Sequence, residues 1–186
     1  MSEIVSPKNL NVTDYYQNFS DVLSIKSDLD ARRTPMVSVC MNLTNDFNKA
    51  TVVRNSNGFL GSAVIMAGRK KYDKRGTVGT HHYEHVEHAE DVAPVIARYR
   101  EDGYTIFAVD NNDDYTPVSL WETTFPEKSV FIYGEEMLGL SDDVIALCDH
   151  MVYIPMFGSV RSLNVGTASG IVMNEYSRQN AHLFAR

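Results

Sequence analysis

Short runs of apolar residues alternate along the chain with segments whose apolar residues recur at helical spacing. The runs predict buried strands, and the other segments predict helices. Alternation of this kind is typical of an α/β fold, in which helices flank both faces of a mostly parallel sheet. We expect strands at 36–43, 62–68, 104–110, 129–135 and 150–156, and helices near 13–31, 47–58, 90–102, 142–148 and 163–180.

Three polar loops follow predicted strands, at residues 44–54, 134–143 and 156–166, and all are rich in Gly, Ser, Asn and charged residues. In an open parallel sheet, ligands bind beyond the carboxyl ends of the strands. We therefore expect these loops to meet at one edge of the sheet and to form a binding site there.

Composition narrows the class of protein. The chain has 186 residues, 44% hydrophobic and 22% charged, as in a globular protein with a substantial core. Cys40 and Cys148 lie far apart without a CxxC motif, which argues for a reducing compartment and against a disulfide or zinc scaffold. No apolar run approaches the roughly 20 residues of a membrane span, and the N-terminus resembles neither a secretory nor a transit signal. We expect a cytoplasmic protein with no membrane partner.

Charge is unevenly distributed. The net charge of −7 argues against a general nucleic-acid coat, because non-specific affinity comes from basic residues that contact phosphates. The segment 69–75, however, reads RKKYDKR and contains five basic residues. Two interpretations stay open at this point, a solvated loop and a contact surface for an anionic partner.

Residues 81–88 read HHYEHVEH and contain four of the six histidines. On a helix, His81, His85 and His88 would share one face, as zinc or iron ligands do. In a short strand, the period of two puts His85 and His88 on opposite sides, and the triad dissolves. Without three histidines on one face, most of the case for a metal site is lost, so we expect no bound metal.

Several common catalytic fingerprints are absent, namely GxGxxG, GxxxxGK[ST], GxSxG and HExxH. The run 154–172 is more informative, because it ends a strand, crosses a loop and enters a helix that is dense in small residues. Gly166 and Gly170 lie four residues apart in this helix. A tightly packed core helix is the simpler explanation, and the close approach of a ligand is the alternative.

Three segments occur in order: NKATVVRNSNGFLG at 48–61, GEEMLGLS at 134–141 and IPMFGSVRSLNVGTASGIV at 154–172. They resemble the three motifs of the SpoU/TrmH family, the RNA ribose methyltransferases of the SPOUT superclass. The first motif has an Asn followed six residues later by an Arg, the second is GxExxGLS, and the third is IPMxGxxxSLNVxxAxxI. The resemblance covers about residues 36 to 180, and on it the chain is identified as a member of this family.

The resemblance implies a SPOUT fold, in which the C-terminal segment threads a loop to form a trefoil knot. Topology rules alone would exclude such a knot, because knots are rare. The resemblance also implies S-adenosylmethionine as methyl donor, bound in the knot loops, and a homodimer whose active sites are completed across the interface. The reaction implied is methyl transfer to a ribose 2′-hydroxyl of tRNA or rRNA. We expect the methyltransferase domain at 36–186, preceded by a helical extension at 1–35.

The resemblance further implies roles for individual residues. Arg54 corresponds to the catalytic arginine, with Asn48, Ser162 and Asn164 around it, and Glu136 is expected to order the second-motif loop. Because a guanidinium hardly deprotonates in proteins, we expect Arg54 to anchor the adjacent phosphate rather than to act as a base. Cofactor contacts, largely from main-chain groups, are expected at Val109, Asp110, Gly134, Ile154, Met156, Ser162, Leu163 and Asn164.

The basic segment and the start of the histidine stretch follow the first motif, where RNA is expected to arrive. The predicted RNA-contacting residues are Arg69, Lys70, Lys71, Arg75, His81 and His82. Two other functions stay open, a SPOUT enzyme that methylates a base and a non-catalytic RNA-binding relative. Arg54 and the SLNV run favour the ribose, and the intact set of Asn48, Arg54, Ser162 and Asn164 argues for catalysis.

Overall fold

The computed structural model describes residues 11–41, 46–68, 71–135 and 138–184. Its centre is a sheet of seven strands in the order β3-β2-β1-β6-β4-β7-β5, in which every neighbouring pair is parallel. The strands are β1 (Met36–Met41), β2 (Ala63–Ala67), β3 (Val86–Ala89), β4 (Thr105–Val109), β5 (Val118–Ser119), β6 (Ser129–Tyr133) and β7 (His150–Tyr153).

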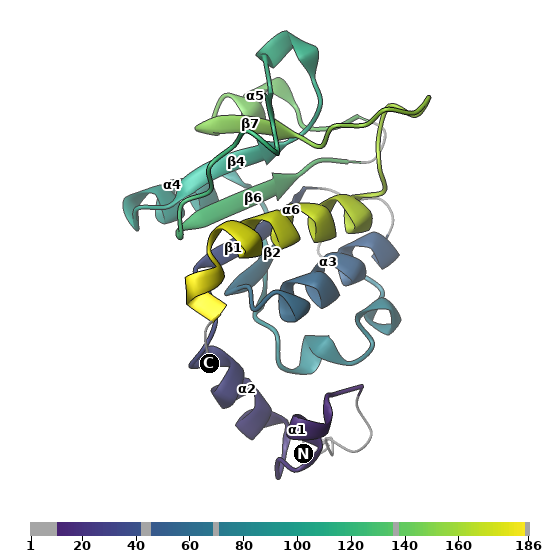
Figure 1. Ribbon diagram of the computed structural model, residues 1–186, viewed down its shortest axis with the longest axis vertical. Coiled ribbons are helices and arrows are strands. Elements are labelled where there is room, and N and C mark those ends of the chain that lie inside the picture. Colours follow the sequence, from purple (N-terminus) through teal and green to yellow (C-terminus); the bar gives the residue numbers. More distant parts are fainter. Residues whose placement is uncertain (1–10, 42–45, 69–70, 136–137, 185–186) are drawn as a thin grey trace.

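Helices cover both faces of this sheet. Figure 1 shows α3 and α6 side by side on the near face, with α4 on the far face and α1 and α2 at the N-terminal end of the molecule. The helices are α1 (Asp14–Gln17), α2 (Val22–Asp30), α3 (Asp46–Gly58), α4 (Ala93–Glu101), α5 (Asp142–Ile145) and α6 (Val165–Gln179). Short 3₁₀ turns add η2 (Lys74–Thr77), η3 (Thr80–His82), η4 (Asp113–Tyr115) and η5 (Ala181–Phe184). The predicted α/β fold with a parallel sheet is confirmed, and the trefoil knot stays a prediction.

The two faces of the sheet form two separate cores, because successive strand residues point to opposite sides. Met36 and Cys40 of β1 belong to a cluster that also contains Val172 and Tyr176 of α6. Val37 and Val39 belong instead to a cluster with residues of α4 and α5. Burial on both faces explains why the central strands β1, β2, β4 and β6 read as nearly continuous apolar runs in the sequence.

The predicted elements match the structure with three differences. The helix expected over 13–31 is two helices, and the second begins at a capping box in which Asp21 and Ser24 bond each other's backbone amides. The strand β5 has only two residues, too few to give a pattern. Strand β3 occupies only the second half of the histidine stretch, and the first half forms η3.

Helices α3 and α6 approach each other closely where α6 begins. Asn55 of α3 donates its Nδ2 to the carbonyl of Gly166 at 2.7 Å and to Ser169 Oγ at 3.0 Å. A Cβ at Gly166 would lie 2.6 Å from Cγ2 of Thr51 and 2.9 Å from its Cβ. The absence of a side chain at Gly166 is therefore needed for helix packing, which favours the core explanation of this glycine.

Gly166→Ala is expected to destabilise the protein by about 1–3 kcal/mol, because an overpacked helix contact outweighs the higher helix propensity of alanine. Urea unfolding measures the change in the free energy of unfolding. Gly58→Ala is the matched control, since a Cβ at this last residue of α3 meets no heavy atom within 4 Å. Equal stability of the two variants would contradict the packing argument.

A buried ion pair attaches the segment before β1 to the domain. Arg33 Nη1 lies 3.0 Å from Glu84 Oε1, and the two side chains are 6% and 0% exposed. Arg33 also donates to the carbonyls of Gly61 and Tyr83, and Asn57 Nδ2 donates to Glu84 Oε1 at 2.8 Å. The pair thus links the end of α2 to α3 and to the start of the histidine stretch.

Candidate active site

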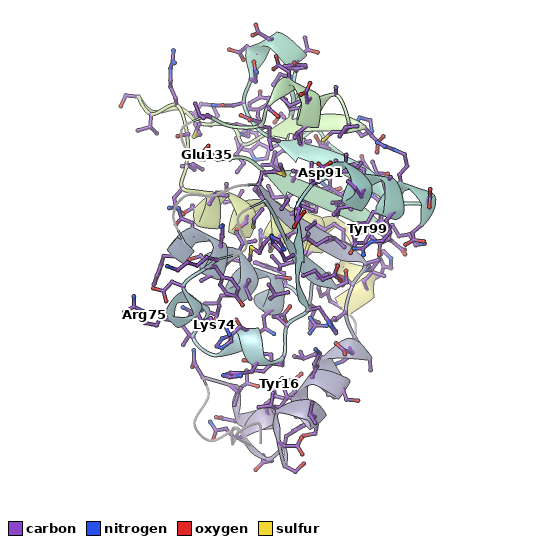
Figure 2. The ribbon with its side chains drawn as sticks, turned by 180° about the vertical axis from the view of Figure 1, so that it is seen from behind. Tyr16, Lys74, Arg75, Asp91, Tyr99 and Glu135 are labelled. Carbon is purple, nitrogen blue, oxygen red and sulfur yellow. The ribbon has the colours of Figure 1, made fainter. Side chains whose placement is uncertain are left out.

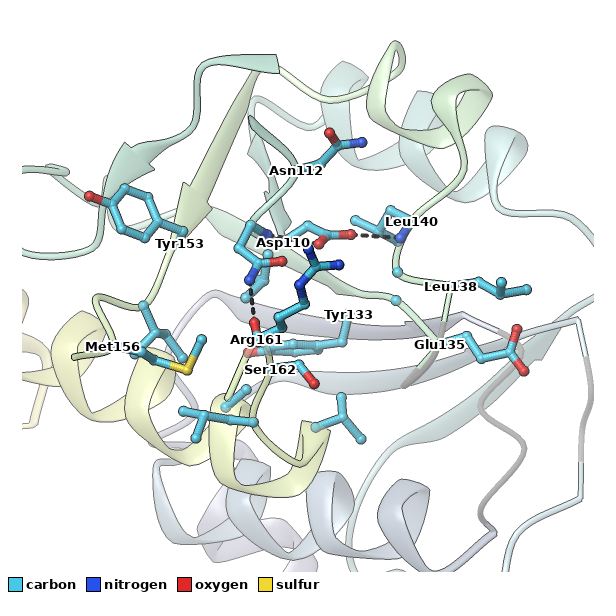
Figure 3. A pocket seen from close by; sticks show the side chains of 18 residues that line it. Asp110, Asn112, Tyr133, Glu135, Leu138, Leu140, Tyr153, Met156, Arg161 and Ser162 are labelled. Carbon is cyan, nitrogen blue, oxygen red and sulfur yellow. Dashed lines mark hydrogen bonds between the residues drawn. The ribbon is translucent and has the colours of Figure 1, made fainter. Parts of the chain in front are cut away.

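A cavity of about 350 Å³ opens at the carboxyl ends of β4, β6 and β7, beside the first turns of α6. Figure 3 shows the side chains that line it, among them Tyr133 of β6, Tyr153 of β7 and, after β4, Asp110. Three polar loops were expected to meet at this edge: residues of the loops 134–143 and 156–166 line the cavity, whereas none of the described residues of 44–54 does. The lining residues are Val109, Asp110, Asn111, Asn112, Tyr133, Gly134, Glu135, Leu138, Gly139, Leu140, Tyr153, Ile154, Met156, Arg161, Ser162, Leu163, Val165 and Ala168.

Asp110 holds two walls of the cavity together. Its carboxylate accepts from the backbone amide of Asn111 and from that of Leu140, both at 2.7 Å. The second bond joins the end of β4 to the loop after β6 (Figure 3). Gly139 in this loop has a φ of +68°, and a Cβ there would lie 2.5 Å from Asp110 Oδ2. Glycine is therefore needed at this position for two reasons: it adopts the positive φ without strain, and it leaves room for the carboxylate of Asp110.

The same loop also passes very close to Gly134, at the end of β6. A Cβ at Gly134 would lie 2.4 Å from the carbonyl carbon of Gly139. The loop after β6 thus folds back on itself at the rim of the cavity, with no side chain between Gly134 and Gly139. Glu135 and Gly139 exchange both backbone hydrogen bonds there, which holds this loop in a closed turn beside the cavity.

The predicted cofactor residues cluster at this cavity. Val109, Asp110, Gly134, Ile154, Met156, Ser162 and Leu163 line it. The eighth, Asn164, is not among the lining residues. Its side chain caps α6 by accepting from the amides of Gly166 and Thr167, at 2.9 and 3.4 Å.

Of the predicted catalytic residues, Asn48 and Arg54 lie on α3, Asn164 caps the start of α6, and Ser162 lies in the loop before it. Asn164 Nδ2 donates to Asn48 Oδ1 at 2.9 Å, which joins the first motif on α3 to the third motif at the start of α6. Arg54 is exposed on α3 and does not line the cavity, whereas Ser162 is exposed and does. Glu136 lies outside the described residues.

The basic segment packs beside α3, and η2 and η3 both contact that helix. Lys71 is exposed, and Arg75 is 88% exposed and paired with Asp73 at 2.6 Å. Figure 2 shows Lys74 and Arg75 at the margin of the molecule, with Arg75 pointing away from it. Arg69 and Lys70 lie outside the described residues.

The histidines of residues 81–88 have separate partners. His81 Nδ1 lies 2.6 Å from Thr77 Oγ1, and its ring lies tilted against that of His82, with 4.1 Å between centroids. Burial, with the neighbouring His82 and Lys74, lowers the pKa of His81 to about 4. His85 Nε2 contacts Asp30 Oδ1, and His88 Nε2 contacts the carbonyl of Gly68. Among the residues described, no group of three His, Cys, Asp or Glu side chains is arranged to hold a metal ion.

Arg161, Asn111 and Tyr153 line the cavity without having been predicted from the sequence. Arg161 lies inside the third motif at a position that the motif leaves unspecified, so motif matching gave it no role. Its place in a loop after a predicted strand was the available signal. Asn111 and Tyr153 are the sequence neighbours of the predicted residues Asp110 and Ile154. Their position at or near the end of a predicted strand was therefore the signal that could have identified them.

A family model described as the SpoU rRNA Methylase family matches residues 35–174. The chain belongs to the SpoU rRNA methylase family, which confirms the predicted family and the prediction of an RNA methyltransferase. A curated relative is the tRNA (guanosine(18)-2'-O)-methyltransferase of Aquifex aeolicus. It is 26% identical over 159 residues, which are 83% of this chain and 74% of the relative.

Solved structures share the fold. The TrmH/SpoU tRNA modifying enzyme of A. aeolicus has a TM-score of 0.78 at 23% identity, over 89% of this chain and 86% of that one. The SpoU methyltransferase AviRb from Streptomyces viridochromogenes, solved with the cofactor AdoMet, has a TM-score of 0.70 at 22% identity, over 83% of this chain and 61% of that one. In the described part of this chain, no helix has the length and apolarity required to cross a membrane.

Proposed function

We propose that this protein transfers a methyl group from S-adenosylmethionine to a ribose 2′-hydroxyl of a tRNA. Family membership gives the reaction class, and the A. aeolicus relative, named for tRNA guanosine methylation, favours tRNA over rRNA. The observation that carries the proposal is the cavity between the second and third motifs, beside the Asn48–Asn164 contact.

The residues of the cavity fit S-adenosylmethionine. Ligand cavities usually have volumes of about 300–1,000 Å³, and this one lies within that range. Leu138, Leu140, Ile154 and Met156 offer apolar contacts for an adenine ring, and Gly134 and Gly139 keep the adjoining wall free of side chains. When bound, S-adenosylmethionine supplies an electrophilic methyl group on a sulfonium.

Arg54 is proposed to bind the phosphate next to the reacting ribose. A guanidinium stays protonated at neutral pH, so it stabilises negative charge that develops on the attacking oxygen instead of removing the proton. Asn48 and Asn164 hold the two motif-bearing helices together, and Ser162 faces the cavity from the third-motif loop. We expect Glu136 to order the second-motif loop.

RNA is proposed to contact the basic segment beside α3. Lys71 and Arg75, together with Arg69 and Lys70, supply charge for phosphates, and His82 is exposed in η3. His81 contributes no charge at neutral pH, because its pKa of about 4 keeps the imidazole neutral. We therefore expect His81 to support the shape of this surface rather than to attract phosphate.

The enzyme is proposed to be a cytoplasmic homodimer. Arg54 does not line the cavity of its own chain, so a second subunit is expected to complete each active site. The division into an extension at 1–35 and a methyltransferase domain at 36–186 stays a prediction, and the family match beginning at residue 35 supports it.

Incubation with radiolabelled S-adenosylmethionine and tRNA is expected to label the RNA, and the label should survive in an alkali-resistant dinucleotide. A 2′-O-methyl group removes the hydroxyl that alkali uses for cleavage at the adjacent 3′ phosphate. Recovery of the label in mononucleotides would indicate base methylation instead. Labelling of rRNA but not tRNA would contradict the proposed substrate.

A further inference from the structure

Arg161 is a cation whose main chain is fixed at the cavity. Asn111, at the end of β4, donates its side-chain Nδ2 to the carbonyl of Arg161. This bond links the third-motif loop to the strand that carries Asp110. Figure 3 shows the guanidinium of Arg161 extending from the loop toward Asp110, into the cavity rather than away from the molecule.

The acidic residues that line the cavity form no ion pair with Arg161 among the described residues, so its guanidinium can bind a ligand. Asp110 and Glu135 are the acidic ones, and Asp110 already accepts two backbone amides. No ion pair or side-chain hydrogen bond of Arg161 is seen among the described residues. Arg161 is also the only Lys or Arg among the residues that line the cavity in the described part of the chain.

We propose that Arg161 binds the α-carboxylate of the methionine part of S-adenosylmethionine. This inference rests on the proposed function and assigns one contact within it. The carboxylate is the only anionic group of that ligand, and a guanidinium can bind it with two parallel hydrogen bonds. The remaining lining is apolar, amide, hydroxyl or acidic, so no other lining side chain of the described chain offers a cation to the carboxylate. A phosphate of the RNA is the competing partner, but the guanidinium extends inward toward Asp110.

Two ligands that differ only in the carboxylate isolate this contact. S-adenosylhomocysteine has the carboxylate, and S-adenosyl-3-thiopropylamine lacks it. Isothermal titration calorimetry measures both dissociation constants without any turnover. Arg161→Met is expected to weaken S-adenosylhomocysteine about 10-fold to 100-fold, the usual range for a hydrogen bond to a charged group, and to leave the thiopropylamine unchanged. Arg161→Lys should recover part of the affinity.

Arg178→Met is the matched control, because Arg178 is paired with Glu175 near the end of α6 and does not line the cavity. Its affinities for both ligands should equal those of the wild type. Equal losses for both ligands in Arg161→Met would overturn the inference, because they would indicate a distorted cavity. Unchanged affinities together with weaker tRNA binding would also overturn it, in favour of a phosphate contact. Failure of the wild type to bind S-adenosylhomocysteine would instead overturn the proposed function and the inference with it.

Discussion

Arg54→Ala is expected to lower kcat for tRNA methylation by about 10²–10³-fold, the usual cost of removing one group that stabilises transition-state charge. Arg54 is exposed on α3 and does not line the cavity, so binding of S-adenosylhomocysteine should stay at the wild-type level. Single-turnover methyl transfer measures the rate, and calorimetry measures the affinity.

Two further variants sharpen this test. Arg178→Ala removes another arginine, remote from the cavity, and should keep full activity. Arg54→Lys keeps the charge but loses the two-pronged geometry, so an intermediate rate is expected. A pH–rate profile of Arg54→Lys that shifts toward the lysine pKa would show that residue 54 removes a proton, against the phosphate-anchoring role.

Mixing two inactive variants tests whether the active site spans two subunits. Ala168→Leu is expected to fill the cavity but to leave Arg54 intact. After exchange with Arg54→Ala, mixed dimers would each have one complete site, so about a quarter of wild-type activity should return. No recovery, despite mixed dimers seen by native mass spectrometry, would mean that Arg54 serves the cavity of its own chain.

The fold was predictable from the sequence because its strands are buried on both faces. Val37 and Cys40 face different cores, so β1 reads as one apolar run, and the helices between such runs imply parallel strands. The two-residue β5 gives no pattern. The break between α1 and α2 depends on the Asp21–Ser24 capping box, which helical spacing alone does not reveal.

The site was predictable only as far as its motifs specify it. The motifs identified Asn48 and Asn164, which are 116 residues apart in the sequence and bonded in the structure. They did not identify Arg161, because its significance depends on a loop position that Asn111 fixes through a hydrogen bond. Long-range contacts of this kind leave no periodic signal in one sequence.

Arg33 and Glu84 show the same limit for stability, since 51 residues separate the two members of this buried pair. Arg33→Met is expected to lower the free energy of unfolding by about 3–5 kcal/mol, because it leaves the carboxylate of Glu84 buried without its cation. Urea unfolding, followed by circular dichroism, measures this change.

Arg98→Met is the matched control. The Arg98–Glu87 pair has the same 3.0 Å separation but is 51% and 47% exposed, so its loss should cost less than about 1 kcal/mol.

The cost of Arg33→Met should also depend on pH. Burial raises the pKa of Glu84 above its ordinary value of 4.5 even with Arg33 present, and removal of the guanidinium raises that pKa further. A carboxyl whose pKa is higher in the folded state contributes stability below the unfolded pKa, and that contribution is lost as the pH rises through the folded pKa. The variant should therefore be less destabilised near pH 5 than near pH 8, because a lower pH favours the protonated, uncharged form of Glu84. Adding Glu84→Gln to Arg33→Met should remove most of this pH dependence, because the amide does not ionise. A loss of stability that is the same at both pH values in Arg33→Met would show that packing around Arg33, and not the unpaired charge of Glu84, accounts for the change.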